Sequence, residues 1–86
     1  MEDNMTKDEV IQVIKENILD NLEDINESDI DPNKSMKDLG ANSLDIIEVV
    51  STSMRQLNIK IPRTELADIQ TIGQLADKFL EHLSNN

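Results

Sequence analysis

Apolar residues recur at helical spacing in three separate stretches of this chain, and a residue typical of a helix start precedes each stretch. Thr6 with Glu9, and Thr71 with Gln74, have the spacing of a capping box, and Asn42 precedes the middle stretch. We therefore expect helices over about residues 7–22, 43–57 and 72–83. The apolar positions of the first and last helices are Val10, Ile11, Ile14, Ile18, Leu22, Ile72, Leu75, Ala76, Phe79, Leu80 and Leu83.

The middle stretch predicts an amphipathic helix when about 100° is taken per residue. Its core-facing positions are Ile46, Val50 and Leu57, flanked by Val49 and Ile47, and its polar face carries Asp45, Glu48, Thr52 and Arg55. Leu44 falls at the edge of the polar face and is expected to stay exposed, either as an isolated apolar residue or as a partner contact. Ser53 falls within the core stripe, where its hydroxyl can bond back to the carbonyl of Val49.

Between the first two helices, residues 23–42 lose the helical spacing and contain Pro32 and Gly40. This long loop should be held down by its apolar residues, which are Ile25, Ile30, Met36 and Leu39. Pro62 favours a short helical turn over about residues 63–67. The sequence thus predicts one all-α domain over residues 1–86, structured from about residue 6 to 83, as a small bundle of three main helices, a short third helix and a long first loop. Residues 84–86 are expected to fray.

The charge of the chain narrows the choice of partners. Eighteen acidic residues against eight Lys and Arg give a formal net charge of -10, which repels nucleic acid and anionic membranes and favours basic patches on other proteins. Phe79 is the only aromatic residue, and cysteine is absent, which excludes disulfides and thiolate metal sites. No apolar run reaches the roughly 18 residues that a membrane span needs. We expect a monomeric, cytoplasmic protein.

Metal sites and catalytic constellations find little support in the sequence. Asp29, Asp31 and Asn33 resemble the start of a calcium-binding loop, but Lys34 and Gly40 occupy the positions that need glycine and glutamate. His82 is the only histidine, and the sequence shows no partner that would complete a zinc site or a catalytic triad. Glycine occurs only at two positions, which excludes a phosphate-cradling glycine loop. We expect neither a metal site nor an enzyme.

Ser43 is the best candidate for chemistry in the chain. If Asn42 is the N-cap, the Ser43 hydroxyl projects from a helix start, where free N–H groups and the helix dipole favour a phosphate-like anion. The alternative is that Ser43 itself only caps the helix.

From Asp38 to about Leu83, the chain resembles the acyl carrier proteins of fatty-acid and polyketide synthesis. The matching residues are Asp38-Leu39-Gly40, Ser43-Leu44-Asp45, Glu48-Val49-Val50, Ile59-Lys60-Ile61-Pro62 and Ile69-Gln70-Thr71-Ile72. The resemblance implies that Ser43 carries a covalent 4′-phosphopantetheine arm, taken from coenzyme A by a phosphopantetheinyl transferase. It also implies partner docking through Asn42, Leu44, Asp45 and Glu48. Acyltransferases, ketosynthases or hydroxymethylglutaryl-CoA synthase-like enzymes would be the partners.

Some residues depart from the fatty-acid carrier pattern. Asn42 stands where those carriers usually have Asp, and Arg55, Lys60 and Arg63 stand where they are typically acidic. The run from Gly40 to Asp45 instead resembles the free-standing donor carriers of polyketide β-branching. Three alternatives remain: a primary fatty-acid carrier, an acidic helical interaction module without a prosthetic group, and a carrier-like protein whose serine is never modified. Acyl cargo would be accommodated beside Met54, or where the small Ser53 leaves room, although both residues also suit an ordinary core.

Overall fold

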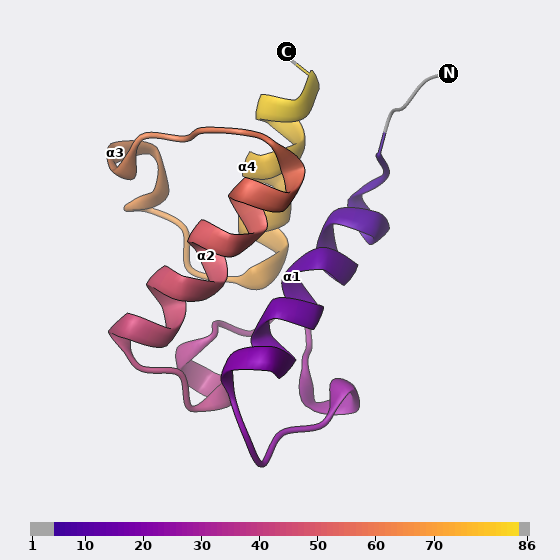
Figure 1. The fold of residues 1–86 in the computed structure, drawn as a ribbon, viewed down its shortest axis with the longest axis vertical. Coiled ribbons are helices and arrows are strands. Elements are labelled where there is room, and N and C mark those ends of the chain that lie inside the picture. The colour runs from indigo at the N-terminus through magenta and orange to yellow at the C-terminus, as the bar shows by residue number, and fades with distance from the viewer. Residues whose placement is uncertain (1–4, 85–86) are drawn as a thin grey trace.

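Four α-helices follow one another in the computed structural model, which describes residues 5–84 of the chain (Figure 1). They are α1 (Lys7–Asn21), α2 (Ser43–Leu57), α3 (Arg63–Leu66) and α4 (Ile72–Ser84). Two short 3-10 turns, Glu27–Asp29 and Lys37–Leu39, interrupt the connection between α1 and α2, and the described residues contain no strand. The predicted all-α bundle with three main helices, a short third helix and a long first loop is confirmed.

The predicted helix bounds are correct to within one residue. Leu22 is the C-cap of α1 and not its last residue, and α3 ends at Leu66. Ser84 belongs to α4, so the expected fraying does not begin there, and residues 85–86 lie outside the described part of the chain. Within that part, no helix combines the length and the apolar character needed to cross a membrane.

Side chains close the starts of α1 and α4 as the capping boxes predict. Thr6 Oγ1 accepts a hydrogen bond from the Glu9 amide at 3.2 Å, and Glu9 Oε1 accepts one from the Thr6 amide at 2.8 Å. Thr71 and Gln74 exchange the same pair of bonds, both at 3.1 Å. Because each bond satisfies a backbone donor that the helix itself leaves unpaired, these helix starts are determined locally.

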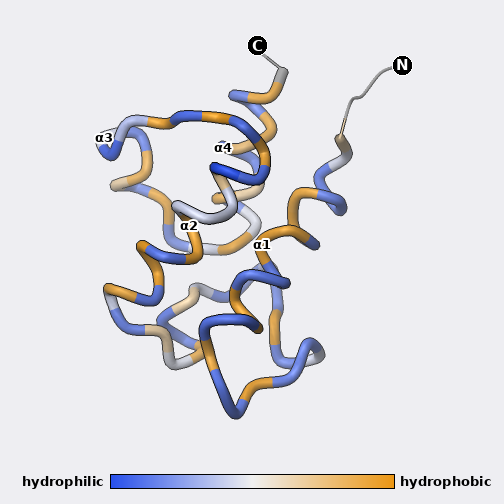
Figure 2. The backbone as a smooth tube through the Cα atoms, in the orientation of Figure 1, coloured by the Kyte–Doolittle hydropathy of each residue, from blue (hydrophilic) through white to orange (hydrophobic). Residues whose placement is uncertain are grey.

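The core lies where α1 packs against both α2 and α4. Figure 2 shows hydrophobic and hydrophilic segments alternating along each long helix, as expected for helices with one buried face. Phe79, the only aromatic residue, is fully buried at the centre of α4. The other fully enclosed apolar side chains include Val10, Ile14, Ile18, Val49 and Ile72. The bundle is therefore held by aliphatic packing around one phenyl ring.

The long loop between α1 and α2 is held against the bundle, as predicted. Ile30 and Met36 are buried, while Ile25 and Leu39 pack partly against the core. The first amides of α4 also donate to loop carbonyls, from Gly73 to Pro32 at 2.8 Å and from Ile72 to Lys34 at 3.0 Å. A Cβ atom at position 73 would lie 3.2 Å from the Pro32 oxygen, so glycine allows this close approach. The loop and the start of α4 thus form one connected unit.

A buried polar contact joins α1 to α2, and the sequence did not reveal it. The Asn17 side chain is only 3% exposed, and its Nδ2 donates to Ser53 Oγ at 2.9 Å and to Gln56 Oε1 at 3.0 Å. The structure gives no bond from the Ser53 hydroxyl to the Val49 carbonyl, and Ser53 Oγ accepts an interhelical one from Asn17. Asn17 occupies a position on the buried face of α1, so the two helices can satisfy these polar groups only by packing in this register.

Replacing Asn17 by alanine is expected to lower the free energy of unfolding by about 1–3 kcal/mol, because the buried Ser53 hydroxyl loses its partner. Urea denaturation followed by circular dichroism measures this change. Asn21→Ala is the matched control, since Asn21 also donates to a carbonyl four residues back, on α1, but is not fully buried. Equal losses in the two variants would contradict a special role for the interhelical contact.

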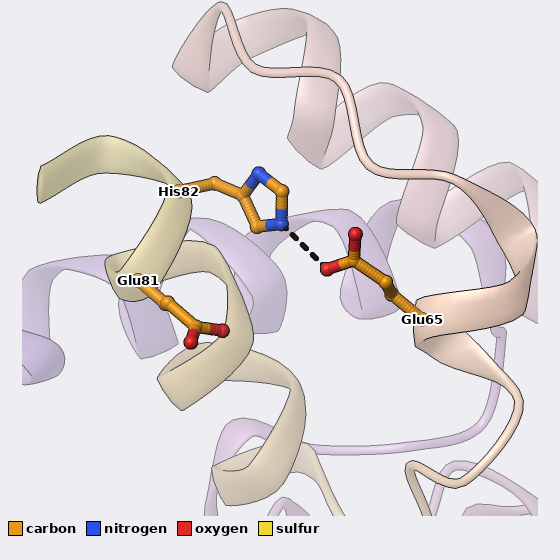
Figure 3. A group of neighbouring side chains, drawn as sticks. All are labelled: Glu65, Glu81 and His82. Carbon is orange, nitrogen blue, oxygen red and sulfur yellow. Dashed lines mark hydrogen bonds and ion pairs between the residues drawn. The ribbon is translucent and has the colours of Figure 1, made fainter. Parts of the chain in front are cut away.

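Charged side chains attach α3 to α4. His82 Nε2 and Glu65 Oε1 lie 2.9 Å apart, and Figure 3 shows the two side chains facing each other across the helices, with Glu81 nearby. Lys78 Nζ lies 3.1 Å from Glu81 and 3.8 Å from Glu65, so these carboxylates already have a cationic partner. The fold thus supplies His82 with an acidic neighbour that sequence analysis did not identify, and the group ties the short α3 to the bundle.

Candidate functional site at the start of α2

Ser43 is the first residue of α2 and takes no part in capping it. The Asn42 Oδ1 accepts a hydrogen bond from the Asp45 amide at 2.8 Å, and Asp45 Oδ2 accepts one from the Asn42 amide at 3.1 Å. Asn42 is therefore the N-cap, as predicted, and the alternative that Ser43 serves only as a cap is wrong. The Ser43 side chain is exposed. Figure 1 shows that α2 begins at the end of the bundle opposite the start of α1.

Backbone donors surround this hydroxyl. The Ile46 amide bonds to the Asn42 carbonyl at 3.0 Å, whereas no acceptor within residues 5–84 is found for the amides of Ser43 and Leu44. Two unpaired N–H groups and the positive end of the dipole of a 15-residue helix thus lie beside an exposed hydroxyl. This set of donors suits a phosphodiester on the Ser43 oxygen, so the residues present fit the prosthetic group.

An exposed surface continues from Ser43 along α2. Leu44 is 77% exposed and Ile47 is 49% exposed, and both lie near the exposed Glu48. We refer to Leu44, Ile47 and Glu48 together as the α2 face. Asp45 is only half-exposed, and one of its oxygens is occupied by the capping box. Of the predicted docking acids, Glu48 is therefore the more accessible.

The prediction that Ile47 flanks the core was wrong, because it is 49% exposed, whereas the predicted core stripe is confirmed: Ser53 is buried, and Ile46, Val50 and Leu57 pack against the core. Val49 and Ser53 are the fully buried residues of α2, while Ile46, Val50 and Leu57 are half-buried. Because α1 packs against α2 at Ser53, the most buried side of α2 is the side that carries Val49 and Ser53. Ile46, Ile47 and Val50 lie further round the helix and border open space.

That open space is a hollow between α2, α3 and the end of the long loop, with a cavity volume of about 850 Å³. Its apolar lining includes Ile46, Ile47, Val50, Met54, Ile61 and Leu66. Met54 borders it as the sequence allowed, but Ser53 does not and instead contacts Asn17. Arg63 and Lys37 supply cationic groups to the same lining.

Some acidic residues of the long loop have local hydrogen-bond partners. Asp31 Oδ1 accepts a hydrogen bond from the Asn33 amide at 2.9 Å, and Asp29 Oδ2 accepts one from the Asn26 amide at 3.0 Å. These carboxylates therefore help to shape the loop backbone.

Comparison with known proteins matches residues 12–79 to the family described as phosphopantetheine attachment site. A polyketide biosynthesis acyl-carrier protein of Bacillus subtilis, AcpK, is 33% identical over 94% of this chain and 99% of its own. An acyl carrier protein of Wolinella succinogenes is 35% identical over 86% of this chain and 91% of its own.

A solved structure gives a third similarity. A chain in the crystal structure of the curacin biosynthetic pathway HMG synthase in complex with acetyl donor-ACP has a TM-score of 0.73 and 38% identity to this chain. The match covers 90% of this chain and 99% of the other, so the matched chain is the small carrier and not the synthase.

Proposed function

Because this chain belongs to the acyl carrier protein family, whose phosphopantetheine attachment region spans most of its length, we propose that Ser43 is the residue that carries the 4′-phosphopantetheine arm. The observation that carries this proposal is the exposed Ser43 hydroxyl, left free by an Asn42 cap and flanked by unpaired backbone donors. As a family member the protein is a carrier and not an enzyme.

Loading requires only an accessible oxygen from this chain. A phosphopantetheinyl transferase would direct the Ser43 Oγ at the phosphorus of coenzyme A that bears the pantetheine. The new P–O bond forms as the pyrophosphate bond breaks, the nucleotide half of coenzyme A leaves, and a base on the transferase takes the hydroxyl proton. The free amides of Ser43 and Leu44 would hold the phosphodiester anion. When bound, the arm supplies a terminal thiol, which is the sulfur nucleophile that this cysteine-free chain lacks.

The tethered thiol holds acyl groups as thioesters and presents them to partner enzymes. A flexible tether raises the local concentration of the acyl group at a transiently docked partner, so tight protein binding is unnecessary. The α2 face borders the attachment residue, and its exposed Leu44 and Ile47 offer apolar contact while Glu48 offers a negative charge. We expect partners to dock on this face with basic and apolar residues.

Mass spectrometry of the intact protein tests the assignment. Incubation with coenzyme A, a divalent metal ion and a broad-specificity transferase should add one phosphopantetheine per chain, and fragmentation should locate it on Ser43. No mass gain with a transferase that loads a control carrier would refute the proposal, as would modification at another serine. The acidic interaction module without a prosthetic group predicts that negative result.

Within this role we propose that the protein is a donor carrier in polyketide β-branching. The similarity to a polyketide carrier and to the acetyl donor of an HMG synthase complex supports this choice. Asn42 and the exposed cationic residues Arg55, Lys60 and Arg63 distinguish the surface from that of fatty-acid carriers. Acetyl transfer from the loaded protein to an HMG synthase-like enzyme should exceed transfer to a fatty-acid ketosynthase. The reverse order would favour the fatty-acid alternative, which the similarity to plain acyl carrier proteins keeps in view.

Reversing the charge of Glu48 is expected to slow acyl transfer to partner enzymes without altering the fold. Glu48→Lys should lower kcat/KM by roughly 5- to 30-fold at low salt, which corresponds to about 1–2 kcal/mol of lost charge pairing. Added salt should bring the kcat/KM of the variant closer to that of the native protein, because it screens the charges. Acyl-transfer assays quenched at fixed times, at two salt concentrations, measure kcat/KM.

Glu16→Lys on α1 is the matched control for Glu48→Lys. Both glutamates are exposed and both accept a side-chain hydrogen bond at 3.4 Å, from Gln12 and Thr52 respectively. The two substitutions change net charge equally. Similar transfer rates for both variants would contradict a docking role for Glu48.

A further inference from the structure

Asn42 has a side-chain function left over after it caps α2. The Asp45 amide is a hydrogen-bond donor, so the Asn42 side chain must present its oxygen there, at 2.8 Å. The Nδ2 group of the planar amide then points to the other side, away from Asp45. It carries two N–H donors, for which the structure gives no acceptor within residues 5–84. Asn42 is exposed and directly precedes Ser43.

Two of the acids close to Ser43 in the chain, Asp45 and Asp38, each have an oxygen bonded to a backbone amide, while Glu48, as far from Ser43 in the chain as Asp38, accepts a hydrogen bond from the Thr52 hydroxyl. Asp45 Oδ2 accepts from the Asn42 amide at 3.1 Å, and Asp38 Oδ2 accepts from the Ser35 amide at 3.2 Å. Asn42 itself adds no charge. In a chain of net charge -10, the immediate neighbourhood of the Ser43 oxygen thus offers donors, from the Ser43 and Leu44 amides and from Asn42 Nδ2.

We propose that the Asn42 side-chain amide donates a hydrogen bond to the phosphate carried by Ser43 and so positions the base of the prosthetic arm. This inference rests on the proposed function, because it needs the phosphodiester at position 43. Asn42 is a positioning residue for the arm, and its two halves act separately: the oxygen holds the start of α2, and the nitrogen holds the phosphate. A carboxylate at this position would keep the first role and replace the second by repulsion.

Nuclear magnetic resonance of the loaded protein tests the contact directly. On conversion from the unloaded to the loaded form, the Asn42 Nδ2 proton signals should move downfield and exchange more slowly with water. The side-chain amide of Asn58, the C-cap at the far end of α2, should not move, because the 15-residue helix separates the two sites by about 22 Å. Unchanged Asn42 amide signals in a fully loaded sample would overturn the proposal.

Substitutions of Asn42 separate its role as the helix cap from its contact with the phosphate. Asn42→Ser and Asn42→Asp both retain an oxygen that can cap the helix, so the thermal midpoint of unfolding should change little. The phosphorus-31 resonance of the loaded form should shift in Asn42→Ser, and should shift further in Asn42→Asp with a dependence on salt concentration.

Lys37 is the competing explanation, because it is an exposed cation close to the site in sequence. If Lys37→Gln moves the phosphorus resonance while Asn42→Ser leaves it unchanged, the proposal is overturned. Failure of the Asn42 contact can also be told apart from failure of the proposed function. Failure of the native chain to gain mass would overturn both, whereas normal loading with an unchanged Asn42 amide would overturn only the contact.

Discussion

Ser43→Ala is expected to abolish loading with phosphopantetheine completely while leaving the bundle folded. In the proposed function the Ser43 oxygen forms the phosphodiester, so its removal should leave no atom that can take its place. The hydroxyl makes no hydrogen bond within residues 5–84, and Asn42 holds the start of α2 without it. The intact mass after incubation with coenzyme A and transferase should therefore equal that of untreated protein, with an unchanged circular dichroism spectrum.

Ser51→Ala is the matched control for this prediction. Ser51 lies on the same helix, about two turns from the start of α2. Its loss should leave loading intact. A mass gain in Ser43→Ala, or the absence of a mass gain in Ser51→Ala, would show that the attachment residue has been assigned incorrectly.

Phe79→Ala is expected to have the largest effect on stability. Removing a fully buried phenyl ring costs about 3–5 kcal/mol through lost burial and the cavity left behind. The free energy of unfolding of a native protein is only about 5–15 kcal/mol, so a substantial part of the stability of this chain would be lost.

Urea denaturation measures the loss in free energy of unfolding, with Leu83→Ala as the comparison for Phe79→Ala. Leu83→Ala, one turn further along α4 at a partly buried position, should cost clearly less. Equal losses at the two positions would contradict the central place of Phe79 in the core. Because loading needs a formed α2 start, Phe79→Ala should also load slowly under conditions where it is partly unfolded.

The helices, their starts and the exposure of Ser43 could be predicted because each depends on residues close together in the chain. A capping box spans three residues, and the spacing of Val10, Ile14 and Ile18 already indicates which face is buried. The resemblance of the run from Asp38 to Asp45 to a family motif is likewise local. For this reason the all-α bundle, the Asn42 cap and the candidate attachment residue follow from the amino-acid order.

Contacts between distant segments could not be predicted in this way. The Asn17 bond to Ser53 joins residues 36 positions apart, and His82 meets Glu65 across 17 positions. Periodicity gives the direction of an apolar face only approximately, so the rotation that exposes Ile47 and buries Val49 was decided by how α1 packs on α2. The sequence by itself determined the helices and pointed to Ser43 as the candidate attachment residue. Tertiary packing decided the hollow, the α2 face and the attachment of α3 to α4, since only packing brings such distant segments together.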